Sequence, residues 1–283
     1  MTAKPKVRVH SGAPRIVGPH ITRRPASAGS SVGSSVLAGP LYGRRPHVPV
    51  PGKLIFQVMS GSRAYGLARA GSDEDWRGVY QASTESLLGL HAPKEHVEFP
   101  PDQQYWELTH FARMCLNGNP NVMELLWIPS DMIALDSKAA RALRAMRRGF
   151  LTMDTATAYF GWIKSTRLKM APTTVRVGGN SRAALPTDRQ DELLEGKRGS
   201  HLVRIATNFL ELLTTGEMEV RLSGRNLELI SSIKAGKVSA TKVLSMVESL
   251  ETQCHAALER HPWGPADPRP VERLLIRVRR GEM

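Results

Sequence analysis

Two neighbouring residues, Gly61 and Ser62, could bind a phosphate through the backbone around them. They follow residues 53–59, an apolar run with the length of a buried strand. A glycine can adopt backbone angles that other residues resist, and a serine can begin a helical turn. A turn of this kind presents free backbone N–H groups, and both these groups and the positive end of the helix favour an anion. We therefore expect a phosphate to bind at this turn.

An acidic run, Asp73-Glu74-Asp75, follows shortly after this turn. If residues 73–80 form a strand, the side chains of Asp73 and Asp75 leave one face and that of Glu74 leaves the other. Two carboxylates on one face repel each other unless a cation lies between them. Mg²⁺ commonly binds one or two carboxylates together with substrate phosphates. The pattern predicts a Mg²⁺ site, with Mn²⁺ as the alternative ion, and it favours phosphoryl or nucleotidyl transfer.

The order and spacing of these motifs resemble the signature of the DNA polymerase beta superfamily of nucleotidyltransferases. The longer motif, Gly-Ser-x-Ala-Tyr-Gly-Leu followed by Ser-Asp-x-Asp-x-Arg-Gly, is similar to that of one branch of the superfamily, the predicted stand-alone nucleotidyltransferases of bacteria and phages. Residues 116–127 contain the Gly-Asn-Pro-Asn and Glu-Leu-Leu motifs of that branch, and residues 197–204 contain the Lys-x-x-x-His-Leu-x-Arg motif of one of its helices. The matches span about residues 54–235 in the order in which the family has them.

The resemblance implies three catalytic carboxylates that also hold the metal. Asp73 and Asp75 match two of them. The third comes from a later strand in the superfamily, where it helps to hold the metal or to activate the attacking hydroxyl. Asp102 is our choice, because of its spacing to the helical pattern that follows it. Glu98 and Glu107 remain rivals.

Nucleotide binding is expected from the turn and from a later basic helix. Lys197, His201 and Arg204 lie at i, i+4 and i+7, so one helix face presents all three. That face could contact the β- and γ-phosphates or the base, or it could be a solvated basic stripe. Arg63 could reach a phosphate or form a structural ion pair. The predicted nucleotide-binding residues are Gly61, Ser62, Arg63, Lys197, His201 and Arg204.

Length and composition are those of a folded protein without a membrane-spanning segment. The chain has 283 residues, of which 41% are apolar and 23% are charged. No apolar segment approaches the ~20 residues that cross a bilayer. Only two cysteines occur, and they are far apart and have no zinc-binding spacing. This cysteine usage predicts a cytoplasmic location, and the lack of a long apolar segment predicts no membrane partner.

The positive charge is concentrated at the N-terminus. The formal net charge is +13, and residues 1–52 contain eight Lys and Arg but no Asp or Glu. This segment is rich in Ser, Gly and Pro, so we predict a disordered basic leader. A transit peptide and an over-extended gene start are alternatives. A phosphate-rich partner such as RNA would suit the charge.

The element pattern predicts an α+β fold, in which a small mixed β-sheet of the polymerase beta palm type precedes an all-helical domain. We assign residues 53–135 to the nucleotidyltransferase module and residues 136–283 to the helical domain. Strands are expected at 53–59, 74–81 and 95–99. A helix is expected from Tyr105 to Gly118, and Asn119 should cap the next helix, with Pro120 at its first position. Further helices are expected near 137–149, 153–170, 190–215, 223–235, 239–260 and 270–279, and a mobile loop is expected at 171–187.

Taken with the resemblance, these features predict a Mg²⁺-dependent nucleotidyltransferase. It would move a nucleoside monophosphate from a nucleoside triphosphate to an acceptor hydroxyl and release pyrophosphate. Two alternatives remain open. One is a module of the same fold that binds nucleotides or nucleic acid without turnover. The other is a toxin-like enzyme that modifies RNA or a protein. Neither the triphosphate nor the acceptor is evident from the residues.

Overall fold

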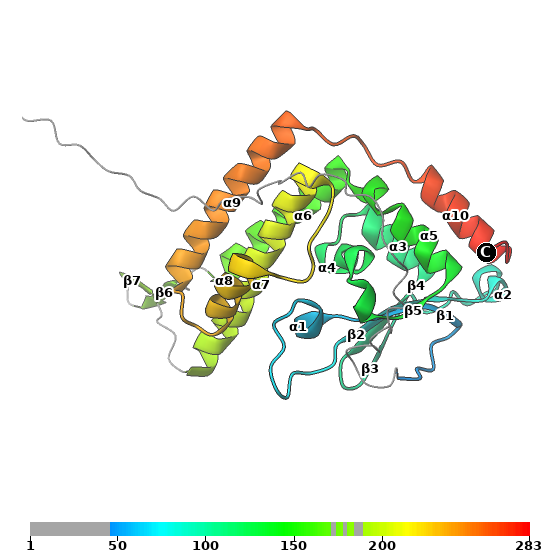
Figure 1. Cartoon of the computed structure of the whole chain (residues 1–283), viewed down its shortest axis with the longest axis horizontal. Coiled ribbons are helices and arrows are strands. Elements are labelled where there is room, and N and C mark those ends of the chain that lie inside the picture. The colour runs from blue at the N-terminus through cyan, green and yellow to red at the C-terminus, as the bar shows by residue number, and fades with distance from the viewer. Residues whose placement is uncertain (1–45, 171–173, 178–179, 184–188) are drawn as a thin grey trace, which may run out of the picture. The chain divides into compact units, whose positions relative to one another are not determined.

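The computed structural model describes residues 46–170, 174–177, 180–183 and 189–283. Most of the predicted leader, residues 1–45, therefore lies outside the described residues. Residues 40–283 form one compact unit. Within the described part of this unit, a β-sheet with helices packed against it is followed along the chain by a series of longer helices (Figure 1).

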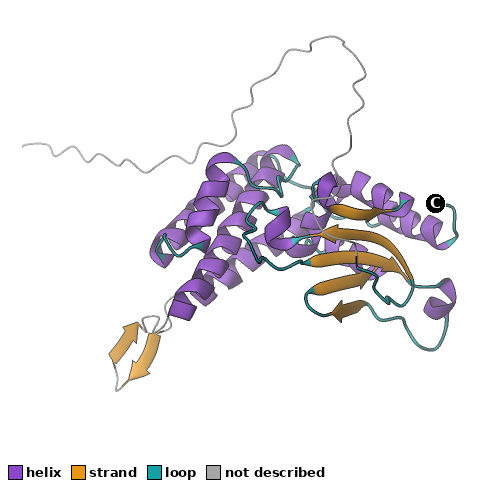
Figure 2. Ribbon diagram, turned by 60° about the horizontal axis from the view of Figure 1, so that its bottom comes forward, coloured by secondary structure: helices purple, strands orange, loops and turns teal. Residues whose placement is uncertain are grey.

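A five-stranded mixed sheet supports the site, in the order β3-β4-β2-β1-β5 (Figure 2). Strands β2 and β4 run parallel, and the other neighbouring pairs are antiparallel. The interior strand β1 is buried from Ile55 to Met59, which explains why its sequence is apolar almost throughout. The strands are β1 Lys53–Met59, β2 Trp76–Gln81, β3 His96–Phe99, β4 Gln103–Glu107 and β5 Ile133–Asp136.

Short helices connect and cover the strands. The predicted cap at Asn119 is confirmed, because its Oδ1 atom accepts hydrogen bonds from the backbone N–H groups of Asn121 and Val122, at 3.1 and 3.3 Å. Pro120 is the first residue of that helix, as expected. The short helices are α1 Gly61–Ala64, α2 Thr84–Leu88, α3 Leu108–Leu116, α4 Pro120–Met123 and α5 Lys138–Ala145, with 3-10 turns η1 Glu124–Trp127, η2 Ser130–Met132 and η3 Arg147–Phe150.

Longer helices make up most of the second half of the chain. They are α6 Met153–Met170, α7 Arg189–Thr215, α8 Gly224–Lys234, α9 Ala240–Arg260 and α10 Arg269–Arg279. Helix α7 contacts α6, α8 and α9, whereas α10 returns to pack on α3 and α5 beside the sheet (Figure 1). The last helix therefore brings the end of the chain back to the sheet.

Four expectations need correction. Strand β2 begins at Trp76, so Asp73 and Asp75 lie in the loop before it and not on the strand. Tyr105 belongs to β4, and the helix that follows begins only at Leu108. Strand β5 has no counterpart among the predicted elements. The segment predicted as a loop at 171–187 contains two paired strands, β6 Thr174–Val177 and β7 Asn180–Ala183.

One hydrophobic cluster runs through the described structure from Ile55 in β1 to Val278 in α10. A smaller cluster, formed by Val48, Tyr80, Ala82 and Tyr105, is separate from it. Val48 lies before β1, so residues just before the first strand also contribute to the buried core.

Candidate active site

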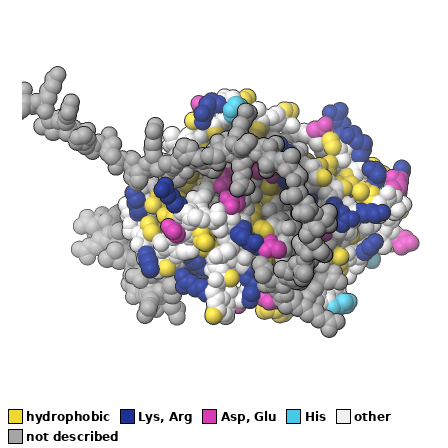
Figure 3. Space-filling view, viewed as in Figure 1, with side chains coloured by type: hydrophobic (Ala, Val, Ile, Leu, Met, Phe, Trp, Pro, Cys, Tyr) yellow, Lys and Arg dark blue, Asp and Glu magenta, His cyan; other side chains and the backbone are white. Residues whose placement is uncertain are grey.

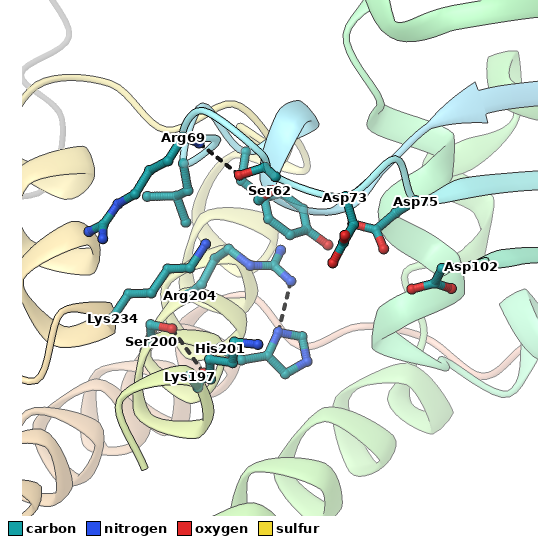
Figure 4. A pocket seen from close by; sticks show the side chains of 13 residues that line it. Ser62, Arg69, Asp73, Asp75, Asp102, Lys197, Ser200, His201, Arg204 and Lys234 are labelled. Atoms are coloured by element: carbon teal, nitrogen blue, oxygen red, sulfur yellow. Dashed lines mark hydrogen bonds between the residues drawn. The ribbon is translucent and has the colours of Figure 1, made fainter. Parts of the chain in front are cut away.

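A pocket of about 740 Å³ lies beside the Gly61-Ser62 turn and has two walls of opposite charge. The first wall carries three carboxylates, from Asp73, Asp75 and Asp102. The second carries side chains from α7 and α8 together with Arg69, and Figure 4 shows several of them pointing toward the space in front of the carboxylates. A pocket of this volume accommodates a small molecule with several charged groups.

The carboxylate of Asp75 lies directly against the glycine of the turn. Gly61 has a φ of +62°, and a Cβ atom built on it would lie 1.7 Å from Oδ2 of Asp75. The backbone N–H of Ser60 also donates to the carbonyl oxygen of Asp75, at 2.8 Å. A side chain at position 61 would need both a strained backbone and the displacement of this carboxylate. The turn and the acid thus form one unit.

Arg63 holds the acidic loop in place. Its guanidinium donates to the carbonyl oxygens of Ser72 and Asp73, at 3.0 and 3.3 Å, and lies 3.9 Å from a carboxylate oxygen of Glu74. Arg63 does not line the pocket, although the sequence predicted that it binds the nucleotide. Its contacts are those of a residue that positions Asp73.

Of the three candidates for the third acid, only Asp102 lines the pocket. Its Oδ1 atom lies 2.9 Å from Nη1 of Arg77, which also approaches Asp75 through Nη2 at 3.9 Å. Glu107 is buried, accepts a hydrogen bond from the N–H of Thr109 at 2.7 Å, and pairs with a C-terminal arginine. Glu98 lies on β3, away from the pocket.

Two carboxyl groups of the acidic wall, those of Asp75 and Asp102, have pKa values shifted in opposite directions. Burial and a hydrogen bond with Asp102 raise the pKa of Asp75 to about 6, against the pull of Arg77. The same interaction lowers the pKa of Asp102, so Asp75 takes up a proton before Asp102 does as the pH falls. A cation bound here would oppose that protonation.

The donors present suit a hard divalent cation. They are carboxylate oxygens, which Mg²⁺ prefers and to which substrate phosphates add further oxygens. Within the described residues, no group of three or more His, Cys, Asp or Glu side chains could hold a metal ion unaided. The residues therefore fit an ion that two carboxylates and a bound phosphate share, rather than one held by the protein alone.

Arg204 is the most buried charged residue of the site. It is 2% exposed, and its Nη1 atom lies 2.6 Å from Oε2 of Glu124. The guanidinium also stacks 3.7 Å from the ring centre of Tyr65, whose hydroxyl donates to Oε1 of Glu124 at 2.5 Å. Arg204 borders the pocket, but its guanidinium is already engaged. This network joins α1, η1 and α7.

His201 is neutral in this setting. Nη2 of Arg204 lies 3.0 Å from Nδ1 of His201, and because arginine can only donate, Nδ1 must accept. Burial, followed by the charge of Arg204, lowers the pKa of His201 to about 4. His201 and Lys197 both line the pocket, as does Ser62, which brings these predicted nucleotide-binding residues together.

Two cations in the pocket, Arg69 and Lys234, were not predicted. Arg69 follows α1 and Lys234 ends α8, so long stretches of sequence separate both from the motif helix that carries Lys197. Gly196 is a residue whose type is related to the position of Lys234. A Cβ atom on it would lie 3.0 Å from the carbonyl oxygens of Ile233 and Lys234, so a glycine here lets α7 approach the end of α8 closely.

With this geometry in view, comparison with known proteins identifies the family. The sequence model of a family described as "RNA repair pathway DNA polymerase beta family" matches residues 43–246. The chain belongs to this family. Membership in the RNA repair pathway DNA polymerase beta family confirms the superfamily predicted from the motifs, as well as the α+β fold with a helical C-terminal region. The matched range contains every residue that lines the pocket.

A curated relative is similar over a shorter range. It is the "Uncharacterized protein YcgL" of Bacillus subtilis (strain 168), which is 31% identical over 100 residues. The similarity covers 34% of this chain and 38% of that protein's length. No solved structure matches the chain. Within the described residues, no helix is both long and apolar enough to cross a membrane.

Proposed function

We propose that this family member transfers a nucleoside monophosphate from a nucleoside triphosphate to an acceptor hydroxyl and releases pyrophosphate. The observation that carries the proposal is the contact between the carboxylate of Asp75 and Gly61, on the acidic wall of a pocket whose opposite wall is cationic. Acids on one side and cations on the other suit a triphosphate whose α-phosphorus faces the acids.

Each part of the pocket has a role in this proposal. The turn at Ser62 and the cationic wall hold and orient the triphosphate. Asp102 accepts the proton of the acceptor hydroxyl, and that oxygen then attacks the α-phosphorus. The bond from the α-phosphorus to the bridging oxygen breaks, and pyrophosphate departs along the cationic wall. Asp73 and Asp75 would hold Mg²⁺ or Mn²⁺, which when bound neutralises the charge that develops on the phosphate.

We further propose RNA as the acceptor. The family description contains an RNA repair pathway, and basic surfaces attract nucleic acid without sequence preference. Helix α10 buries Val271, Leu274 and Val278 and turns a different face to solvent. Figure 3 shows Lys and Arg side chains at the right of the molecule, where α10 lies in Figure 1. The exposed arginines of this helix are Arg269, Arg273 and Arg277, and the exposed Arg280 follows directly after it.

One observation favours a second function, which is binding without turnover. Arg77 already pairs with Asp102, and a catalytic acid held by an arginine is a weaker base. A module of this kind would bind nucleotides and RNA but release no pyrophosphate.

The test is incubation of the purified full chain with each labelled ribonucleoside triphosphate, Mg²⁺ and an RNA with a free 3′ hydroxyl. We expect label on the RNA and an equal amount of pyrophosphate, and loss of both with a chelator. Asp73→Asn and Asp75→Asn should each lower transfer by at least about 100-fold. The matched control is Asp154→Asn, because Asp154 is exposed on α6 and outside the pocket.

Two results separate the proposals. Transfer by Asp75→Asn at the wild-type rate would contradict the assignment of the acidic wall. Binding of a triphosphate by the wild-type chain without label transfer to any acceptor in a cell extract would favour the binding module.

A further inference from the structure

A second cavity adjoins the acidic wall at Asp102. It has a volume of about 270 Å³ and is lined by residues 98–104, which comprise the end of β3, the start of β4 and the turn between them. We call it the hairpin cavity. Asp102 lines both the hairpin cavity and the first pocket, and Figure 4 shows it at the far right of that pocket, on the side away from Lys234. One carboxylate therefore borders two cavities.

Hydrogen bonds fix the turn of this hairpin against the neighbouring strand. The backbone N–H of Trp76 donates to the carbonyl oxygen of Asp102 at 3.0 Å, and Nη1 of Arg77 donates to the same oxygen at 3.1 Å. Within the turn, Nε2 of Gln103 donates to the carbonyl oxygen of Pro100 at 3.0 Å. The shape of the hairpin cavity is thus set by the sheet and does not depend on a ligand.

The lining offers flat apolar groups and a free amide. Phe99 is half-buried, and the rings of Pro100 and Pro101 are exposed. Gln104 is half-buried, and within the described residues its side chain forms no hydrogen bond, so its amide can both donate and accept. Flat apolar groups beside a hydrogen-bonding amide suit a nucleobase at the end of a single strand.

The charges of the hairpin cavity are negative. Glu98 and Asp102 line it, and none of the described residues that line it is Lys or Arg. Arg77 lies next to Asp102, but its Nη1 atom is already 2.9 Å from Oδ1 of that residue. A phosphate in this cavity would meet two carboxylates and no free cation, which is unfavourable. The occupant is therefore an uncharged group.

We propose that the hairpin cavity binds the terminal nucleoside of the acceptor RNA, with its base on the hairpin and its free hydroxyl at Asp102. The proposal deepens the proposed function, on which it rests for the reaction at that hydroxyl. The volume of the cavity is at the small end for ligand pockets, which limits the occupant to a group of about this size. Glu98 and Asp102 would make the protein select RNA that ends in a hydroxyl over RNA that ends in a phosphate.

This selection places the protein after a phosphate-removing step. An RNA with a 3′ phosphate would first have to undergo hydrolysis of that phosphomonoester. Water would replace the 3′ oxygen on phosphorus, and the products are inorganic phosphate and the free hydroxyl that the hairpin cavity accepts.

The test is calorimetric titration of the full chain with two trinucleotides of one sequence, the first with a 3′ hydroxyl and the second with a 3′ phosphate. We expect the phosphate end to bind at least about tenfold more weakly. Gln104→Ala should weaken the binding of the hydroxyl end by about fivefold, through the loss of one hydrogen bond. Glu98→Lys should narrow the difference between the two ends by about tenfold, because it replaces a repulsive charge with an attractive one.

Two matched controls carry the same substitutions outside both cavities. They are Gln253→Ala, at a half-buried position on α9, and Glu85→Lys, at an exposed position on α2. Both should keep the wild-type ratio of the two affinities, since any general attraction by the added lysine acts on both trinucleotides.

Several outcomes would overturn the assignment of the hairpin cavity. They are no binding of either trinucleotide, equal binding of the two ends by the wild type, an unchanged ratio in Glu98→Lys, and unchanged binding by Gln104→Ala. Each variant alters one side chain that is not fully buried, so either one tests the proposal if the other fails to fold. The titrations contain no triphosphate. Selection between the ends without label transfer would therefore count against the proposed function alone, and transfer with equal binding of the ends would count against the hairpin cavity alone.

Discussion

The contact between Gly61 and Asp75 makes the Gly61-Ser62 turn sensitive to the smallest possible substitution. Gly61→Ala would place a methyl group where Oδ2 of Asp75 now lies, on a backbone with a φ of +62°. We expect transfer to fall by at least about 100-fold, because the carboxylate must move away from the reacting phosphate. The measurement is the initial rate of label transfer at saturating triphosphate.

A second glycine separates displacement from backbone strain. Gly281 has a φ of +73°, but an added Cβ atom would meet nothing within 4 Å. Gly281→Ala should lower the unfolding free energy by about 1 kcal/mol and leave the transfer rate unchanged. An equal loss of stability in both variants together with full activity of Gly61→Ala would show that the contact with Asp75 has no catalytic importance.

His201 should make stability depend on pH in a specific window. Its pKa of about 4 in the folded chain lies below the ordinary value of 6.5, so the unfolded chain binds the proton more readily. Stability therefore falls as the pH is lowered from about 6.5 to 4, by up to about 3 kcal/mol from this residue. Above that window, His201 contributes no pH dependence.

The check compares chemical unfolding of the wild type and His201→Gln at pH 7.0, 5.5 and 4.5. The carboxylates of the chain titrate in both proteins, so only the difference between the two curves reports on His201. The wild type should lose more stability than the variant across this range. Parallel curves would mean that His201 is charged in the fold, and that its Nδ1 atom does not accept from Arg204.

At the scale of elements, the buried ion pair between Glu124 and Arg204 connects η1 with α7, and Tyr65 adds α1 to the same network. Glu124→Gln would leave the charge of Arg204 buried without a counter-charge, which should cost about 3–5 kcal/mol in unfolding free energy. The double variant Glu124→Leu with Arg204→Met should recover much of that loss. A matched control is Asp131→Asn, which removes a more exposed ion pair with Arg221 and should cost about 1 kcal/mol or less.

Two other outcomes for Glu124→Gln would assign different roles to the ion pair. If Glu124→Gln unfolds like the wild type but no longer transfers, Arg204 is free to act on the substrate, as the sequence suggested. If stability falls and activity at low temperature is kept, the network only positions α1.

The same elements show what the sequence could and could not predict. The helices α6 to α10 were recovered almost to their ends, because Gly, Pro or Ser residues lie between them. The helix predicted near 137–149 was too long, since α5 ends at Ala145 and the 3-10 turn η3 follows it. Strand β5 was missed, since Ile133–Asp136 is four residues long and too short to show a period. The start of β2 was placed too early because strand ends are set by pairing with β1, and Met59 pairs with Trp76.

The site divides in a similar way. Asp73, Asp75 and Ser62 could be predicted because they lie within one short stretch that matches the sequence motif of a family. Lys234 could not, because its nearness to Lys197 depends on how α8 packs against α7. Arg69 lies in that short stretch, between Ser62 and Asp73, but in the spacer between the two motifs. A sequence motif reports contacts within one segment, whereas a charged wall assembled from three segments has no local pattern.

At the scale of the whole molecule, the hydrophobic cluster crosses the predicted domain boundary between residues 135 and 136 without interruption. Helix α10 also returns to the sheet, where Arg279 contacts Glu107 and the carbonyl oxygen of Ala82. These contacts tie the last helix of the chain to β2 and β4. Unfolding of the described part of the chain should therefore occur as one transition, observed alike by circular dichroism and by tryptophan fluorescence.

The charge outside the family match leads to a different expectation. Residues 1–42 precede the matched range and contain six Lys and Arg with no acidic residue. A chain that lacks them keeps every residue of the pocket, so its transfer to a short acceptor at saturating concentration should equal that of the full chain. Its affinity for a longer RNA should fall at low salt, and the dependence of that affinity on salt should become less steep, since fewer counterions are released on binding. The measurement is fluorescence anisotropy with a labelled RNA over a series of salt concentrations.

The control is the full chain with all six cations changed to glutamine, which should behave like the shortened chain. If the glutamine variant instead binds like the wild type and only the shortened chain is weaker, then the segment acts through something other than its charge, and residues 43–283 supply the electrostatic attraction by themselves.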